Sequence, residues 1–65
     1  MIAPYDIFIL KRGEYVWLEV AKTLDDAKVR VQKLGATQPG DYLIFNQNTV
    51  QSISLTVYPP KPEAH

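Results

Sequence analysis

The stretch TLDDAKVRVQKLG, residues 23–35, decides the fold, because it carries the clearest helical pattern in the chain. Thr23 can cap the helix by accepting a hydrogen bond from the amide of Asp26, and Gly35 is a typical stop. One narrow stripe of the expected helix collects its apolar side chains, Leu24, Ala27, Val31 and Leu34. The pattern predicts a helix over residues 24–34 whose apolar stripe must lie on another surface.

Four segments around this helix have the aromatic and β-branched content of strands. They are residues 5–12, 15–22, 41–46 and 50–58. Gly13 with Glu14 is expected to turn the first pair, since glycine supplies the positive φ that tight hairpins need. The sequence NQN at Asn46–Asn48 favours a turn in the second pair. The predicted order is therefore β-β-α-β-β.

The first and third strands are apolar on both faces, which is typical of the interior of a sheet. The second and fourth strands are then its edges. The favoured strand order is 2-1-3-4, with 2-1-4-3 as the alternative. The sequence predicts an α+β fold, in which one helix packs on one face of a four-stranded antiparallel sheet.

The alternation of the second strand suggests which side chains meet the helix. Val16, Leu18 and Val20 are aliphatic and alternate with aromatic or charged residues, so we expect this row to face the helix. The expected core joins that row to the helix stripe and to one side of the other strands: Phe8, Leu10, Val16, Leu18, Val20, Leu24, Ala27, Val31, Leu34, Leu43, Phe45, Ile53 and Leu55. The opposite face then carries a candidate interaction surface, which comprises Tyr15, Trp17, Tyr42 and Ile44.

Composition bounds the class of protein. Seven basic and seven acidic residues give a formal net charge of 0, which argues against partners gathered by charge, such as nucleic acid or an anionic membrane. No apolar run approaches the roughly 20 residues of a membrane span. The chain has no cysteine and no signal-peptide pattern at its start, so we expect a cytoplasmic protein.

The chain is expected to hold a single domain over residues 1–58. The remaining residues 59–65, PPKPEAH, are rich in proline and cannot join a ladder of strands, so they are interpreted as a disordered tail. Pro59 to Pro62 matches the P-x-x-P pattern that some aromatic grooves recognise, but a stiff solvated end is the simpler interpretation.

Residues that could carry catalysis are sparse. The single histidine, His65, is the last residue of the expected tail, which leaves no histidine-based triad or metal cluster within one chain. Asp25 and Asp26 are explained by the positive N-terminal end of the helix. The three glycines are isolated, so they form no phosphate loop. We expect a protein that is not an enzyme and binds neither a cofactor nor a metal.

The aromatic side chains of the open sheet face suggest binding instead. They could stabilise the sheet as cross-strand pairs, meet a second copy of the chain as a homodimer, or bind a different protein or a small ligand. Stacking of bases from single-stranded nucleic acid is the alternative from another class, but such sites normally add a positive groove. The leading hypothesis is a small protein-interaction module.

Four motifs resemble those of small uncharacterised bacterial proteins. They are YDIF at residues 5–8, VWLE at 16–19, the helix pattern L-x-x-A-x-x-x-V-x-x-L at 24–34 and DYLIF at 41–45. In those proteins a similar aromatic strand, a VWLE-like strand, one helix and a Y-x-(I/V)-F strand follow in the same order. The resemblance covers most of residues 5–49 and implies the same fold and a bacterial origin. Its motifs are structural, and it implies no activity.

Overall fold

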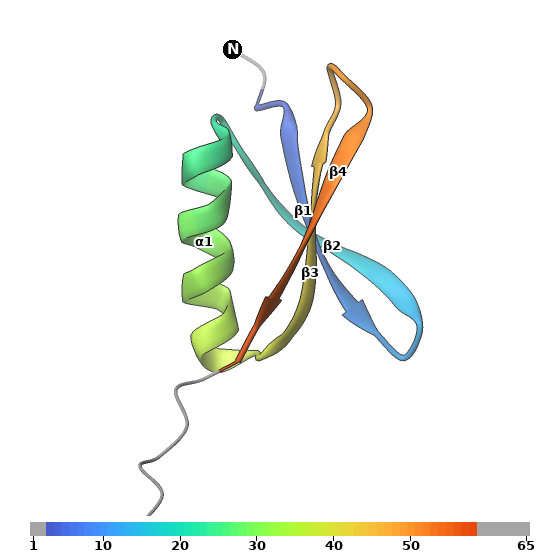
Figure 1. The fold of residues 1–65 in the computed structure, drawn as a ribbon, viewed down its shortest axis with the longest axis vertical. Helices are drawn as coiled ribbons and strands as arrows, with labels where there is room; N and C mark the ends of the chain where they lie inside the picture. Colours follow the sequence, from blue (N-terminus) through green and yellow to red (C-terminus); the bar gives the residue numbers. More distant parts are fainter. Residues whose placement is uncertain (1–2, 59–65) are drawn as a thin grey trace, which may run out of the picture.

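The computed structural model describes residues 3–58 of the chain (Figure 1). Its elements are β1 (Tyr5–Lys11), β2 (Glu14–Ala21), α1 (Leu24–Thr37), β3 (Gly40–Asn46) and β4 (Gln51–Val57). The predicted order β-β-α-β-β is confirmed. The tail expected at residues 59–65 lies outside the described residues.

The four strands form one sheet in the order β2-β1-β3-β4, and each neighbouring pair is antiparallel. Figure 1 shows α1 along one side of this sheet, and the helix contacts all four strands. The predicted α+β class and the favoured order are therefore confirmed, and the alternative order 2-1-4-3 is wrong. Within residues 3–58, no helix combines the length and apolar content needed to cross a membrane.

The helix begins as predicted but ends later. The Thr23 hydroxyl accepts a hydrogen bond from the Asp26 amide at 3.0 Å. Gly35 does not stop the helix, which continues to Thr37. Gln38 leaves the helical conformation because it precedes Pro39, whose ring disfavours the α region for the preceding residue.

Gly35 has a packing role instead. It is buried, and a Cβ built on it would overlap the side chain of Val57 in β4. The absence of a side chain therefore lets the last turns of α1 approach the edge of the sheet closely.

Both hairpin turns differ from the sequence-based expectation by one residue. The β1–β2 turn is Arg12-Gly13 rather than Gly13-Glu14, with φ of 54° and 80° at its two central residues. Positive φ at both positions is what a type I′ hairpin requires. The β3–β4 turn spans the four residues 47–50 and ends at Val50 with φ of 60°, an unfavourable conformation for a β-branched residue.

The core lies between α1 and the face of the sheet that the helix covers. Its buried side chains are Ile7, Ile9, Ala21, Ala27, Val31, Tyr42, Ile44 and Val57. Five partly buried side chains pack against them: Tyr5, Leu18, Leu24, Leu34 and Leu55. The helix stripe, Leu18 and Leu55 were therefore assigned to the correct side.

The central strands present the opposite face to the helix from the one expected. Four side chains assigned to the core from the sequence lie on the far side of the sheet and are half-buried: Phe8, Leu10, Leu43 and Phe45. Three others assigned to the core are exposed: Val16, Val20 and Ile53. The four central-strand assignments were wrong because the turn lengths were wrong. Val20 also lies on the far side, opposite Asp6. Val16 and Ile53 lie on the helix side, opposite Ile9 and Ile44, but are exposed there.

The β3–β4 hairpin shows how one residue reverses a face. A three-residue turn over residues 47–49 would pair Leu43 with Ile53 and put both against the helix. The actual four-residue turn pairs Ile44 with Ile53, so Ile44 joins the core and Leu43 faces away. A shift of one residue moves every side chain of a strand to the other face.

A bulge breaks the alternation of β2. Ile7 of β1 pairs with Glu19 while Phe8 pairs with Trp17, so Leu18 is an extra residue in β2. Trp17 and Glu19, two residues apart, consequently point to opposite faces. No period-two pattern could have predicted this.

The first prediction tests which face is covered. We expect Ile44→Ala to lower the free energy of unfolding by about 2–4 kcal/mol, because the side chain is fully enclosed beneath α1. Leu43→Ala, its neighbour on the other face, should cost clearly less. Urea unfolding followed by circular dichroism measures both. A larger cost for Leu43→Ala would mean that the helix covers the opposite face.

The second prediction concerns Gly35. At an exposed helix position, Gly→Ala stabilises a protein by about 1 kcal/mol. Here we expect Gly35→Ala to destabilise the domain by about 1–3 kcal/mol, because its methyl group would overlap Val57. Thermal unfolding of Gly35→Ala, Val57→Ala and the double variant forms a complete cycle. The cost of Gly35→Ala should shrink in the Val57→Ala background, and an equal cost in both backgrounds would refute this account.

Candidate interaction surface

The face of the sheet opposite α1 is called the outer face. Alternation and register give its members: Asp6, Phe8 and Leu10 of β1, Tyr15, Trp17 and Val20 of β2, Asp41, Leu43 and Phe45 of β3, and Ser52, Ser54 and Thr56 of β4. Within residues 3–58, no other element packs over it (Figure 1).

Apolar and polar side chains are separated across the outer face. One row of paired residues runs from Trp17 in β2 through Phe8 and Leu43 to Ser54 in β4. Every outer-face residue of β4 is a serine or a threonine, whereas those of β2 are aromatic or aliphatic. The apolar area therefore covers β2, β1 and β3 and ends at the row of serine and threonine side chains along β4.

The most exposed large side chains of this area lie on β2. The exposed fraction is 55% for Trp17 and 50% for Tyr15, although both residue types bury most of their surface in a typical core. Phe8 of β1 and Leu43 and Phe45 of β3 are each half-buried by their neighbours on the sheet. The result is a continuous apolar surface with two projecting aromatic rings.

The indole ring of Trp17 is held in place by hydrogen bonds. Its Nε1 donates to Oδ1 of Asp6 at 3.1 Å, and the other carboxylate oxygen of Asp6 accepts from Nε2 of Gln47 at 2.9 Å. Gln47 comes from the β3–β4 turn, so the network links strands at both sides of β1. A ring fixed in this way loses less conformational entropy when a partner covers it.

The charges on the outer face are all negative. Asp6 and Asp41 are its two charged residues, and Oδ1 of Asp41 accepts from the hydroxyl of Thr56 at 2.7 Å. The basic residues of α1, namely Lys28, Arg30 and Lys33, lie on the other side of the sheet. The helix side is mixed in charge, because Glu19, Asp25 and Asp26 lie there with these basic residues.

The sequence-based site is half right. Tyr15 and Trp17 lie on the outer face, but Tyr42 and Ile44 do not, because each is 1% exposed in the core beneath α1. The Tyr42 hydroxyl donates to the carbonyl of Gln38 just after the helix, and burial raises the pKa of Tyr42 above its usual value. This tyrosine therefore secures the end of α1 to β3 rather than meeting a partner.

Sequence reasoning missed most of the apolar residues of the outer face. Five of them were assigned to the core, namely Phe8, Leu10, Val20, Leu43 and Phe45, and Asp6 was not considered. One signal was available for Asp6: it is a lone carboxylate within an apolar strand, YDIFIL, and such a residue needs either solvent or a partner.

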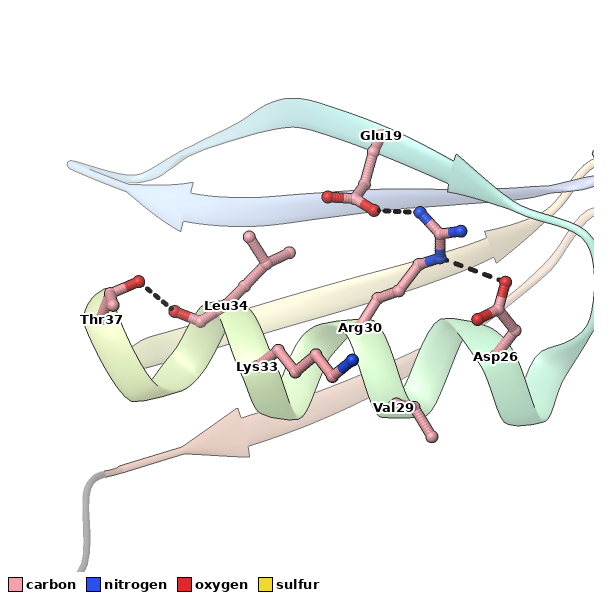
Figure 2. Close-up of a pocket in the computed structure, with 7 residues that line it drawn as sticks. All are labelled: Glu19, Asp26, Val29, Arg30, Lys33, Leu34 and Thr37. Atoms are coloured by element: carbon pink, nitrogen blue, oxygen red, sulfur yellow. Dashed lines mark hydrogen bonds and ion pairs between the residues drawn. The ribbon is translucent and has the colours of Figure 1, made fainter.

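A groove on the other side of the molecule runs between α1 and the edge strand β2 (Figure 2). Its volume is about 350 Å³. Arg30 spans it, with NH1 at 2.7 Å from Glu19 of β2 and Nε at 3.1 Å from Asp26. The hydrogen bond to Glu19, and to a smaller extent the one to Asp26, raises the pKa of Arg30, so the guanidinium stays charged. This side chain links the helix to β2 through Glu19.

A second groove of about 370 Å³ lies between the start of α1 and the β3–β4 hairpin. Its lining is uncharged: Tyr5, Leu24, Ile44, Asn46, Gln51, Ser52 and Ile53. Over residues 3–58 no three His, Cys, Asp or Glu side chains gather closely enough to hold a metal ion. In the first groove both carboxylates, Glu19 and Asp26, bind Arg30, and the hydroxyl of Thr37 donates to the carbonyl of Leu34.

Comparison with family models, curated proteins and solved structures finds no match to this chain. The outer face is therefore judged on its own geometry and chemistry.

The third prediction tests the hydrogen bond that holds Trp17. This is the only tryptophan of the chain, so its fluorescence reports on one site. We expect Asp6→Ala to lower the fluorescence anisotropy, because the indole loses its acceptor and gains rotational freedom. Asp41→Ala, which removes the other outer-face carboxylate, should leave the anisotropy unchanged. Equal anisotropy in the parent and Asp6→Ala would show that the bond does not fix the ring.

Proposed function

We propose that this protein is a small, non-catalytic interaction module that binds a protein partner through its outer face. The observation that supports this most is the uncovered apolar row across β2, β1 and β3, with Trp17, hydrogen-bonded to Asp6, at its end. Uncovered apolar area of this kind commonly marks an interaction site. Tryptophan and tyrosine are also enriched among the residues that dominate binding energy.

The two carboxylates of the outer face indicate which kind of partner would be complementary to it. Asp6 and Asp41 flank the apolar row, so a partner with apolar side chains and neighbouring lysine or arginine residues is complementary to it. Two copies packed outer face to outer face would bring carboxylates towards carboxylates. The face therefore fits a different protein better than a second copy of itself.

Single-stranded nucleic acid is the second candidate for the same face. The exposed rings of Trp17 and Tyr15 could stack on bases. Against it, the residues of the outer face include two carboxylates and no basic side chain, so the phosphates would be repelled rather than neutralised. The negative charge makes the protein partner the stronger proposal.

The fourth prediction is that a random peptide library displayed on phage will yield binders to this protein. We expect the enriched peptides to combine aromatic or aliphatic residues with lysine or arginine. Binding of one such synthetic peptide can be followed by the fluorescence of Trp17 and by calorimetry. Trp17→Glu should weaken it at least roughly tenfold, because the substitution removes an anchor and adds a third negative charge.

Val29→Glu is the matched control. Val29 is 52% exposed, similar to Trp17, but it lies on α1 on the other side of the molecule. Peptide affinity should not change in this variant. Failure to enrich any peptide, or equal weakening by both variants, would overturn the proposal. Salt-sensitive binding of a thymidine oligonucleotide that Trp17→Glu abolishes would favour the second candidate instead.

A further inference from the structure

Within residues 3–58, the edge strand β4 carries none of the features that commonly protect a sheet edge from pairing with another strand. Its sequence QSISLTV contains no charge, no proline and no glycine, and it pairs regularly with β3 along its whole length. In the part of the chain that the structure describes, no strand neighbours the other edge of β4, which presents its backbone N–H and C=O groups. Native edge strands usually carry a charge, a proline or a bulge against such pairing.

The other edge of the same sheet has this protection. β2 contains the bulge at Leu18, which interrupts the regular spacing of its backbone groups. It also carries Glu14 and Glu19, and Glu19 is bound to Arg30 of the helix. The two edges of one small sheet therefore differ, and β4 is the one left open.

β4 is self-complementary when read in the antiparallel direction. Pairing two copies about Ser54 places Ser52 opposite Thr56 of the second copy, and Ser54 opposite itself. It also places Ile53 opposite Leu55 on the helix side of the sheet. Polar residues thus meet polar residues on one face and aliphatic residues meet on the other, the matching that stabilises an antiparallel pair.

We propose that two copies of this chain pair through their β4 strands and form one continuous eight-stranded sheet. A two-fold axis through Ser54, perpendicular to the sheet, relates the copies. The backbone groups at the open edge of β4 are then satisfied by those of the second copy. Ile53, 39% exposed in the single chain, is partly covered by Leu55 of the second copy.

The same axis keeps both outer faces on one side of the dimer. The serine and threonine rows of the two β4 strands meet at its centre, and an apolar area lies beyond each of them. Seven strand spacings separate the two copies of β2, a distance of about 34 Å. The dimer would therefore present two equal binding areas to a partner, although the pairing itself does not depend on the proposed function of those areas.

The fifth prediction uses sedimentation equilibrium over about 10 μM to 1 mM of protein, a range suited to a small interface. The parent chain is expected to show reversible dimerisation. Ser54→Lys places two like charges opposite each other on the axis, so the dimer should dissociate at least roughly tenfold more readily. Ser54→Glu should act in the same way. Ser54 is exposed, so the circular dichroism spectrum of each variant should match that of the parent.

Mixing the two variants provides the decisive measurement. Ser54→Lys and Ser54→Glu should each sediment as a monomer, and an equal mixture should recover the dimer, because opposite charges then meet on the axis. Trp17→Glu should dimerise like the parent, since it lies on the far edge of the sheet. A parent that stays monomeric, a mixture that does not recover, or a dimer lost in Trp17→Glu would each overturn the β4 interface. None of these results would affect peptide binding by the outer face of a single chain.

Discussion

One helix can cover one face of a sheet, and this constraint determines the rest of the structure. The 14-residue α1 touches all four strands, and every buried side chain lies either on it or beneath it. Gly35 lets its last turns approach Val57, so coverage extends to the β4 edge. The other face receives no such cover in the described chain, and its aliphatic and aromatic side chains bury only what their neighbours on the sheet can hide.

The sequence was sufficient for the fold because several independent signals agree. The Thr23 cap and the apolar stripe identify the helix, and strands that are apolar on both faces belong in the middle of the sheet. The same property hid which face the helix covers. When Phe8 and Ile9 are equally suitable for a core, the turn lengths decide, and the second turn is one residue longer than its sequence suggests.

The candidate surface was only partly predictable for related reasons. Trp17 and Tyr15 were placed correctly because aromatic and aliphatic residues alternate in β2 next to the β1–β2 turn. Tyr42 was misplaced with the register of β3, and its hydroxyl contributes to the core by bonding the end of the helix. The bond between Asp6 and Trp17 joins residues 11 positions apart on neighbouring strands, so no local pattern reveals it.

The bulge also affects how this protein can change in evolution. Deleting one residue within a regular strand exchanges core and surface for every residue beyond the deletion. Deleting Leu18 would instead restore a regular ladder, with Trp17 still opposite Phe8 and Glu19 still opposite Ile7. A lineage could therefore shorten β2 by a single codon at this position, losing one half-buried leucine while both faces of the sheet keep their side chains.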